Sequence, residues 1–80
     1  MSKLKINKDG NRCWFNEKGQ LHREDGPTIE DNNGYKAWYK NGLRHREEGP
    51  AIEWSNGDKS WYINGIEYSE EDYNVEINNI

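Results

Sequence analysis

The amino-acid sequence predicts an all-β fold, an antiparallel meander of tandem hairpin repeats that ends in a short helix. Residues 21–30 recur as residues 44–53, so a unit of about 23 residues has been copied in tandem. Asn-Gly and Asp-Gly pairs recur between short apolar segments, and such pairs are typical of hairpin turns. A third aromatic pair, Trp61-Tyr62, opens a unit that then departs from the pattern, as the last unit of a stack usually does.

A single domain is expected over residues 1–80, with units at about 13–36 and 37–60, a partial unit at about 61–68 and a capping helix at about 69–77. Within the second unit, residues 35–40, 43–46 and 50–54 are expected as strands, the first two joined by Asn41-Gly42. Pro27 and Pro50 lack a backbone N–H, so each is expected at the first residue of a strand.

The Asn-Gly and Asp-Gly pairs are expected to reverse the chain through two-residue turns, because asparagine and glycine adopt the positive φ angles that such turns need. The first unit differs from the second by one residue. Trp14 and Gly19 are five positions apart, whereas Trp38 and Gly42 are four positions apart. The extra residue indicates a longer turn or a bulge, which shifts strand pairing locally.

Aromatic side chains are expected to supply most of the core. Hydrophobic residues make up only 31% of the chain and the mean hydropathy is −1.36, but four Trp and five Tyr are present. Each such ring can bury about 150–250 Å². Neighbours in a strand point to opposite faces, so the pairs Trp38-Tyr39 and Trp61-Tyr62 are each expected to place one ring on either face of the sheet.

The C-terminal residues carry the signals of a short helix. Ser69 followed by Glu70, Glu71 and Asp72 resembles a capping box, with acidic residues in the first turn where the helix dipole favours them. Tyr73, Ile77 and Ile80 have the spacing of one helix face and are expected to close the end of the sheet.

Charge and cysteine content restrict the function. The formal net charge is −4, with 11 basic and 15 acidic residues, so generic nucleic-acid binding is not expected. Cys13 is the single cysteine and cannot form an internal disulfide, which favours a reducing, cytoplasmic location. Cys13 is expected as a small buried residue rather than a nucleophile. The sequence contains no apolar run of signal-peptide or membrane-span length, so no membrane association is expected.

Two His-Arg-Glu triplets, His22-Arg23-Glu24 and His45-Arg46-Glu47, are the natural candidates for catalysis. Consecutive strand residues point to opposite faces and do not converge on one substrate atom. A structural role is therefore expected, with each histidine bonding a turn carbonyl and each arginine stacking on a tryptophan or pairing with Glu24 or Glu47. We expect no catalytic residue, no cofactor and no metal site, because two histidines and one distant cysteine do not supply converging ligands.

Tryptophan, tyrosine and arginine dominate binding hot spots, and this chain is rich in all three. The residues assigned to partner binding are Trp38, Tyr39, Arg44, Arg46, Trp54, Trp61 and Tyr62. The alternative role for the rings among them is core packing, since the chain has little other apolar material.

The run from Trp38 to Trp54, with Trp-Tyr-x-Asn-Gly followed by His-Arg-Glu-x-Gly-Pro-Ala, resembles a repeat of small proteins from tailed bacteriophages and giant viruses. More distantly it is similar to MORN-type repeats. The resemblance covers about residues 13–73, departs at Lys18 and Thr28, and loses the triplet in the third unit. It implies a virus-encoded β-repeat protein and carries no implied reaction.

The sequence thus favours a non-enzymatic viral accessory protein that binds, and inhibits, a host protein such as a defence enzyme. A nucleotide-sequestering protein is the second hypothesis, with aromatic rings stacking the base and Arg23, Arg44 or Arg46 pairing the phosphates. A structural component of the virion, assembled through strand edges, is the third. The expected oligomeric state is a monomer or a homodimer.

Overall fold

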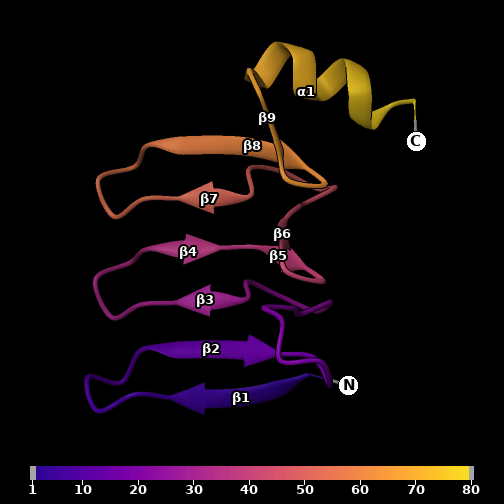
Figure 1. The fold of residues 1–80 in the computed structure, drawn as a ribbon. Helices are drawn as coiled ribbons and strands as arrows, with labels where there is room; N and C mark the ends of the chain where they lie inside the picture. The colour runs from indigo at the N-terminus through magenta and orange to yellow at the C-terminus, as the bar shows by residue number, and fades with distance from the viewer. Residues whose placement is uncertain (1, 80) are drawn as a thin grey trace.

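In the computed structural model, which describes residues 2–79, the chain is mostly antiparallel β-sheet with one short C-terminal helix, as predicted (Figure 1). Seven strands form one sheet in the order β1-β2-β3-β4-β7-β8-β9, while β5 and β6 pair as a separate hairpin. The elements are β1 Lys3–Ile6, β2 Arg12–Phe15, β3 Ile29–Glu30, β4 Lys36–Ala37, β5 Tyr39–Lys40, β6 Leu43–Arg44, β7 Ile52–Glu53, β8 Lys59–Ile63, β9 Ile66–Tyr68 and α1 Glu70–Ile77.

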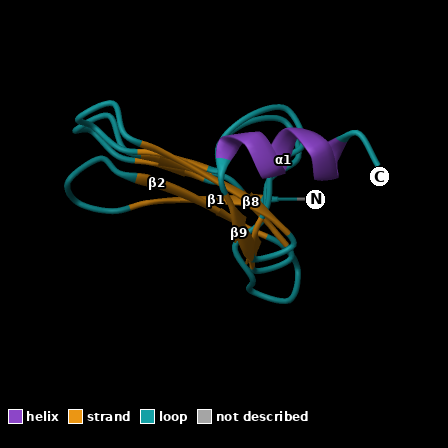
Figure 2. Cartoon of the chain, turned by 90° about the horizontal axis from the view of Figure 1, so that it is seen from above, coloured by secondary structure: helices purple, strands orange, loops and turns teal. Residues whose placement is uncertain are grey.

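Strands β1, β2, β3, β4, β7 and β8 lie side by side in one layer, with the turns after β1, β3 and β7 along one edge (Figure 1). Figure 2 shows α1 on one side of this layer and β9 turning away on the other. Cys13, Ile29, Ala37, Ile52 and Ser60 are paired in register across five neighbouring strands. Ala37 and Ile52 in this row are 0% and 2% exposed, and the other buried apolar residues described are Ala51, Ile63 and Tyr73, so the buried core is small and mostly aliphatic rather than aromatic as expected.

The strand expected over residues 35–40 is interrupted at Trp38. The Trp38 N–H donates to the Ala51 carbonyl, whereas the Trp38 carbonyl accepts from the His45 N–H. The chain therefore changes partner at this residue, from β7 to the segment that follows β6. The strand expected over residues 50–54 is likewise shorter, because only Ile52–Glu53 pair as β7.

The proposed placement of the prolines at strand starts is wrong. Pro27 and Pro50 each lie two residues before a strand, in loops that lead into β3 and β7. Their carbonyls accept hydrogen bonds from the guanidinium groups of Arg23 and Arg46, at 3.0 Å in both cases. Each proline carbonyl thus bonds to an arginine side chain.

Two-residue turns occur at only two of the expected positions. Asn41-Gly42 and Asn64-Gly65 have φ near 51° and 84°, and asparagine tolerates this left-handed conformation better than most residues. Elsewhere the reversal is longer, as in residues 16–20, where the Asn16 N–H donates to the Gln20 carbonyl at 2.8 Å. The extra residue of the first unit therefore lies in a longer turn, one of the two alternatives expected.

Helix α1 begins where the sequence predicts. The Ser69 hydroxyl accepts from the Asp72 N–H at 3.1 Å, which satisfies one of the free amides of the first turn. Tyr73 is 2% exposed, and its hydroxyl donates to the Arg46 carbonyl and accepts from the Gly49 N–H. Ile80, expected on the same face, lies outside the described residues. Within the part of the chain that the structure describes, α1 is too short and too polar to cross a bilayer.

Thr28 gives a test of how the hairpins are locked together. Its side chain is fully buried; its hydroxyl donates to the Tyr39 carbonyl at 3.1 Å and accepts from the Tyr39 N–H at 2.8 Å. Thr28→Val keeps the shape but removes both bonds, so we expect the free energy of unfolding to fall by about 1–3 kcal/mol in urea denaturation. Thr28→Ser keeps the hydroxyl and loses one methyl group, so the free energy of unfolding should fall by about 1 kcal/mol. A valine variant as stable as wild type would contradict this role.

Candidate functional site

The two histidines join each loop to the turn of the following hairpin. His22 Nδ1 accepts the N–H of Asn41, and His45 Nδ1 accepts the N–H of Asn64, both at 3.0 Å. Both asparagines open the turns with positive φ angles. The expected bond from histidine to a turn carbonyl is therefore wrong, because each ring accepts from a turn N–H. His45 is 9% exposed, so this contact lies inside the protein.

These bonds determine the imidazole tautomer. A ring nitrogen that accepts a hydrogen bond carries no hydrogen, so the hydrogen of the neutral ring is assigned to Nε2. His45 Nε2 lies 2.9 Å from Glu47 Oε2, and His22 Nε2 lies 3.5 Å from Glu24 Oε1. The lone pair that a general base would need is already used by a turn amide.

The His45–Glu47 contact predicts a pH effect on stability. The hydrogen bond from His45 holds the pKa of the Glu47 carboxyl below its ordinary value. A lowered folded-state pKa stabilises the protein above the unfolded-state pKa, and this contribution is lost as pH falls through the folded-state value. Between roughly pH 5 and pH 3, wild type should lose more stability than Glu47→Gln. Urea titrations at several pH values measure this. The difference should be small because Glu47 is 55% exposed, and identical pH slopes would contradict it.

Arg23 covers Trp14 and binds three acceptors. Its guanidinium carbon lies 3.8 Å from the Trp14 ring centroid. The group donates to the Pro27 carbonyl and pairs with Glu30 at 3.0 Å and with Asp25 at 2.9 Å. The stacking matches the sequence expectation. The ion pairs differ from the expectation, because Arg23 pairs with Glu30 and Asp25 and not with Glu24.

Arg46 repeats this arrangement 23 residues later. Its guanidinium carbon lies 3.7 Å from the Trp38 ring centroid, and the group donates to the Pro50 carbonyl at 3.0 Å. It pairs with Glu53 at 3.2 Å, not with Glu47 as expected. The loop folds back over β7 and so brings Arg46 into contact with Glu53, seven positions later in the chain.

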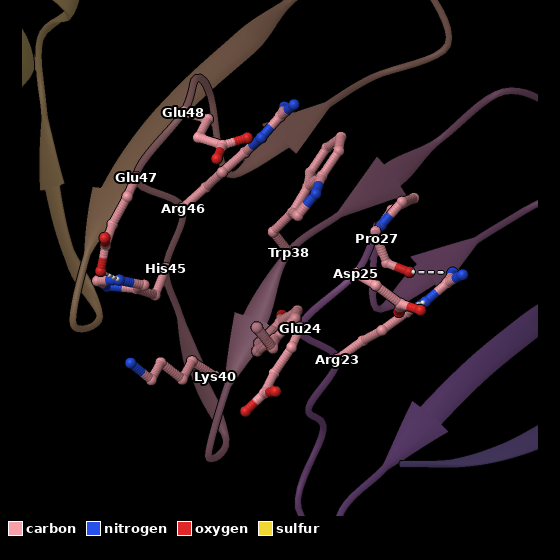
Figure 3. Close-up of a pocket in the computed structure, with 12 residues that line it drawn as sticks. Arg23, Glu24, Asp25, Pro27, Trp38, Lys40, His45, Arg46, Glu47 and Glu48 are labelled. Carbon is pink, nitrogen blue, oxygen red and sulfur yellow. Dashed lines mark hydrogen bonds and ion pairs between the residues drawn. The ribbon is translucent and has the colours of Figure 1, made fainter. Parts of the chain in front are cut away.

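A groove of about 570 Å³ lies between the loops at residues 23–27 and 45–48 (Figure 3). Trp38 and Lys40 lie between the two loops. The charged lining residues are Arg23, Glu24, Asp25, Lys40, Arg46, Glu47 and Glu48. Both arginines already bind carboxylates, so the groove presents more free negative than positive charge and is a poor receptor for phosphate.

The environment of Cys13 favours the protonated thiol over the thiolate. Burial, and then the Asp31 charge, raise the pKa of the Cys13 thiol, which reduces its thiolate fraction. Cys13 is half-buried and paired in register with Lys5 and Ile29. Over residues 2–79, no three His, Cys, Asp or Glu side chains gather in a way that could hold a metal ion.

A second surface gathers aromatic rings beside the exposed guanidinium of Arg44. We call it the tyrosine face, formed by Tyr35, Tyr39, Arg44, Trp54 and Tyr62. Arg44 Nε donates to the Tyr39 hydroxyl at 3.1 Å, and the guanidinium carbon lies 5.9 Å from the Tyr39 ring centroid and 5.3 Å from that of Tyr62. Tyr35 and Trp54 meet edge to face, with centroids 6.5 Å apart.

Tyr35 belongs to the same cluster. Burial, and then the proximity of Tyr39, raise the pKa of the Tyr35 hydroxyl, with further influence from Arg44 and Tyr62. Within the described residues, no carboxylate lies within ion-pair distance of Arg44, unlike Arg23 and Arg46. The tyrosine face therefore carries an exposed, uncompensated positive charge among rings.

The structure divides the seven residues assigned to partner binding. Tyr39, Arg44 and Tyr62 come together on the tyrosine face and Trp54 joins it through Tyr35, whereas Trp38 and Arg46 stack on each other and line the groove. Trp61 lies half-buried on β8, the strand that α1 contacts. Sequence reasoning missed Tyr35. Its spacing of four residues from Tyr39, which a strand places on the same face, could have indicated it.

No family model, curated protein or solved structure matches this chain, so its function is argued from the geometry of these two surfaces.

Proposed function

We propose that this chain is a non-enzymatic viral accessory protein that binds, and thereby inhibits, a bacterial host protein such as a defence enzyme. The tyrosine face is the binding surface. The observation that carries the proposal is Arg44, an exposed arginine in contact with Tyr39 and Tyr62, with no carboxylate of the described residues within ion-pair distance. The viral assignment is supported by the sequence resemblance alone.

The composition of the tyrosine face supports protein binding. Tyrosine, tryptophan and arginine are the residue types that contribute most to binding energy at interfaces. Trp54 is 40% exposed, so the tyrosine face includes accessible apolar surface. Over residues 2–79, Arg44 forms no ion pair with a carboxylate, unlike Arg23 and Arg46. A partner carboxylate could therefore bind its guanidinium without displacing one.

The contacts of the loops support a structural role for the His-Arg-Glu triplets. Both histidines accept a turn N–H, and both arginines bind a proline carbonyl and a glutamate. The same contacts occurring 23 residues apart support tandem units of this length. In the third unit Tyr68 and Ser69 stand at the His and Arg positions, and α1 follows in place of the loop.

The proposal is tested by affinity purification of the tagged protein from nuclease-treated bacterial lysate, followed by mass spectrometry. We expect one stoichiometric protein partner. Arg44→Ala and Tyr62→Ala should each weaken its binding roughly 30-fold, as loss of a hot-spot residue costs about 2 kcal/mol or more. The matched controls are Arg12→Ala and Tyr68→Ala, which lie off the tyrosine face and should retain the partner.

Two results would overturn the proposal. One is a partner that all four variants retain equally. The other is the absence of any protein partner combined with a rise in melting temperature on adding nucleotides, because a ligand that binds the folded state stabilises it. The second result would establish the nucleotide-sequestering hypothesis instead.

A further inference from the structure

Strand β1 is an open edge of the seven-stranded sheet. It pairs with β2 on one side, and over residues 2–79 no strand lies on its other side. All four of its residues, Lys3–Ile6, are exposed. At the opposite end of the sheet, the chain continues from β9 into α1, which contacts both β8 and β9. The sheet is therefore covered at one end and open at the other (Figure 1).

The backbone of β1 presents free hydrogen-bonding groups to this open side. In an antiparallel pair, residues bonded to the partner strand alternate with residues that are not. The Asn7 N–H bonds to the Asn11 carbonyl, so Lys5 and Lys3 are the next residues bonded to β2. The N–H and C=O groups of Leu4 and Ile6 consequently point away from β2.

The side chains of β1 alternate in character. Lys3 and Lys5 occupy one face, and the Lys5 ammonium lies 5.4 Å from the centroid of the Phe15 ring. Leu4 and Ile6 occupy the other face and are 46% and 57% exposed. An added strand would therefore meet positive charge on one face and apolar surface on the other.

We propose that β1 takes up an extended segment of a partner protein as an eighth strand, and that this segment alternates acidic with apolar residues. The outward groups of Leu4 and Ile6 supply the main-chain bonds of such strand addition. The acidic residues pair with Lys3 and Lys5, and the apolar ones pack on Leu4 and Ile6. This site is separate from the tyrosine face and does not depend on it.

A second copy of this chain is a poorer occupant of the same edge. When two β1 strands pair about a two-fold axis, residues on the same face lie opposite each other. About such an axis, two antiparallel registers place three residues of one Lys3–Ile6 strand opposite three residues of its copy. One places Lys5 against Lys5 of the copy, and the other places Lys3 against Lys5. Like charges directly opposite each other are destabilising, so both registers are disfavoured.

The test uses a capped synthetic peptide of six residues that alternates glutamate and valine, with fluorescence anisotropy for affinity and amide NMR for location. We expect saturable binding that slows hydrogen exchange at the Leu4 and Ile6 amides. The double variant Lys3→Glu, Lys5→Glu should bind this peptide at least tenfold more weakly and should bind a lysine–valine peptide instead. Lys18→Glu, Lys40→Glu applies the same charge change away from β1 and should leave affinity for the acidic peptide within twofold of wild type.

Leu4→Pro provides a second variant that keeps both lysines. It removes one outward N–H without breaking a bond to β2, so it should also weaken the acidic peptide. Three results would overturn the proposal: unchanged affinity in the charge-reversed variant, no protection of the Leu4 and Ile6 amides, or a wild-type dimer in sedimentation that Leu4→Pro dissociates. Because the tyrosine face is intact in all these variants, failure here is distinguishable from failure of the proposed function.

Discussion

Replacing Arg46 with alanine should lower the free energy of unfolding by about 2–4 kcal/mol. The guanidinium stacks on Trp38, donates to the Pro50 carbonyl and pairs with Glu53, and one substitution removes all three contacts. A partly desolvated cation–π contact contributes about 1–2 kcal/mol, and a carbonyl left without its donor costs about 1–3 kcal/mol. The total stability of a chain of 80 residues is roughly 4–12 kcal/mol, so this loss is a large share of it.

Urea denaturation followed by tryptophan fluorescence measures the effect. Arg46→Lys keeps the charge but loses the planar donor geometry, so its stability should fall between those of alanine and wild type. Arg44→Ala is the matched control, because Arg44 is exposed and outside the loop; it should change stability by less than about 0.5–1 kcal/mol. An Arg46→Ala variant as stable as Arg44→Ala would show that the stacked arginines do not hold the loops.

Replacing Tyr73 with alanine should destabilise the protein by about 3–5 kcal/mol and release α1 from the sheet. Tyr73 is the most buried residue of the helix at 2% exposed, and truncating a buried aromatic ring costs this much. Its hydroxyl also satisfies the Arg46 carbonyl and the Gly49 N–H. Tyr73→Phe keeps the ring and should cost about 1–3 kcal/mol through those two groups alone.

Amide hydrogen exchange locates the effect. In Tyr73→Ala, the amides of residues 73–77 should exchange at least tenfold faster than those of β2 and β3. The reason is that α1 loses its main contact with the sheet, whereas the hydrogen bonds between the strands remain. Val75→Ala is the control, because Val75 is 58% exposed and should leave exchange unchanged. Equal exchange in the Tyr73 and Val75 variants would mean that the helix is held by other contacts.

Local chemistry was enough to predict the turns at Asn41-Gly42 and Asn64-Gly65 and the start of α1 at Ser69, because each depends on a few consecutive residues. The break in the strand at Trp38 was not predictable in the same way. It arises because the two backbone groups of Trp38 bind different segments, an arrangement that depends on long-range pairing.

The candidate site was predictable to a similar extent. Recurrence of arginine and tryptophan in the unit indicated their stacking, but not that Glu30 and Glu53 would pair with the arginines across a folded loop. The tyrosine face combines residues from three hairpins, β3–β4, β5–β6 and β7–β8, which no single segment reveals. The edge strand β1 lies before the first repeat at residue 13, so a description based on repeats left it outside the units.

Photocrosslinking from the tyrosine face tests the central functional claim most directly. A benzophenone-bearing phenylalanine at position 62 of the tagged protein, expressed in bacterial cells, should form a covalent adduct with the same partner that affinity purification recovers. The same group at position 75, on the exposed side of α1, should form none. An adduct with that partner from position 75 but not from position 62 would contradict the assignment of the tyrosine face as the binding surface.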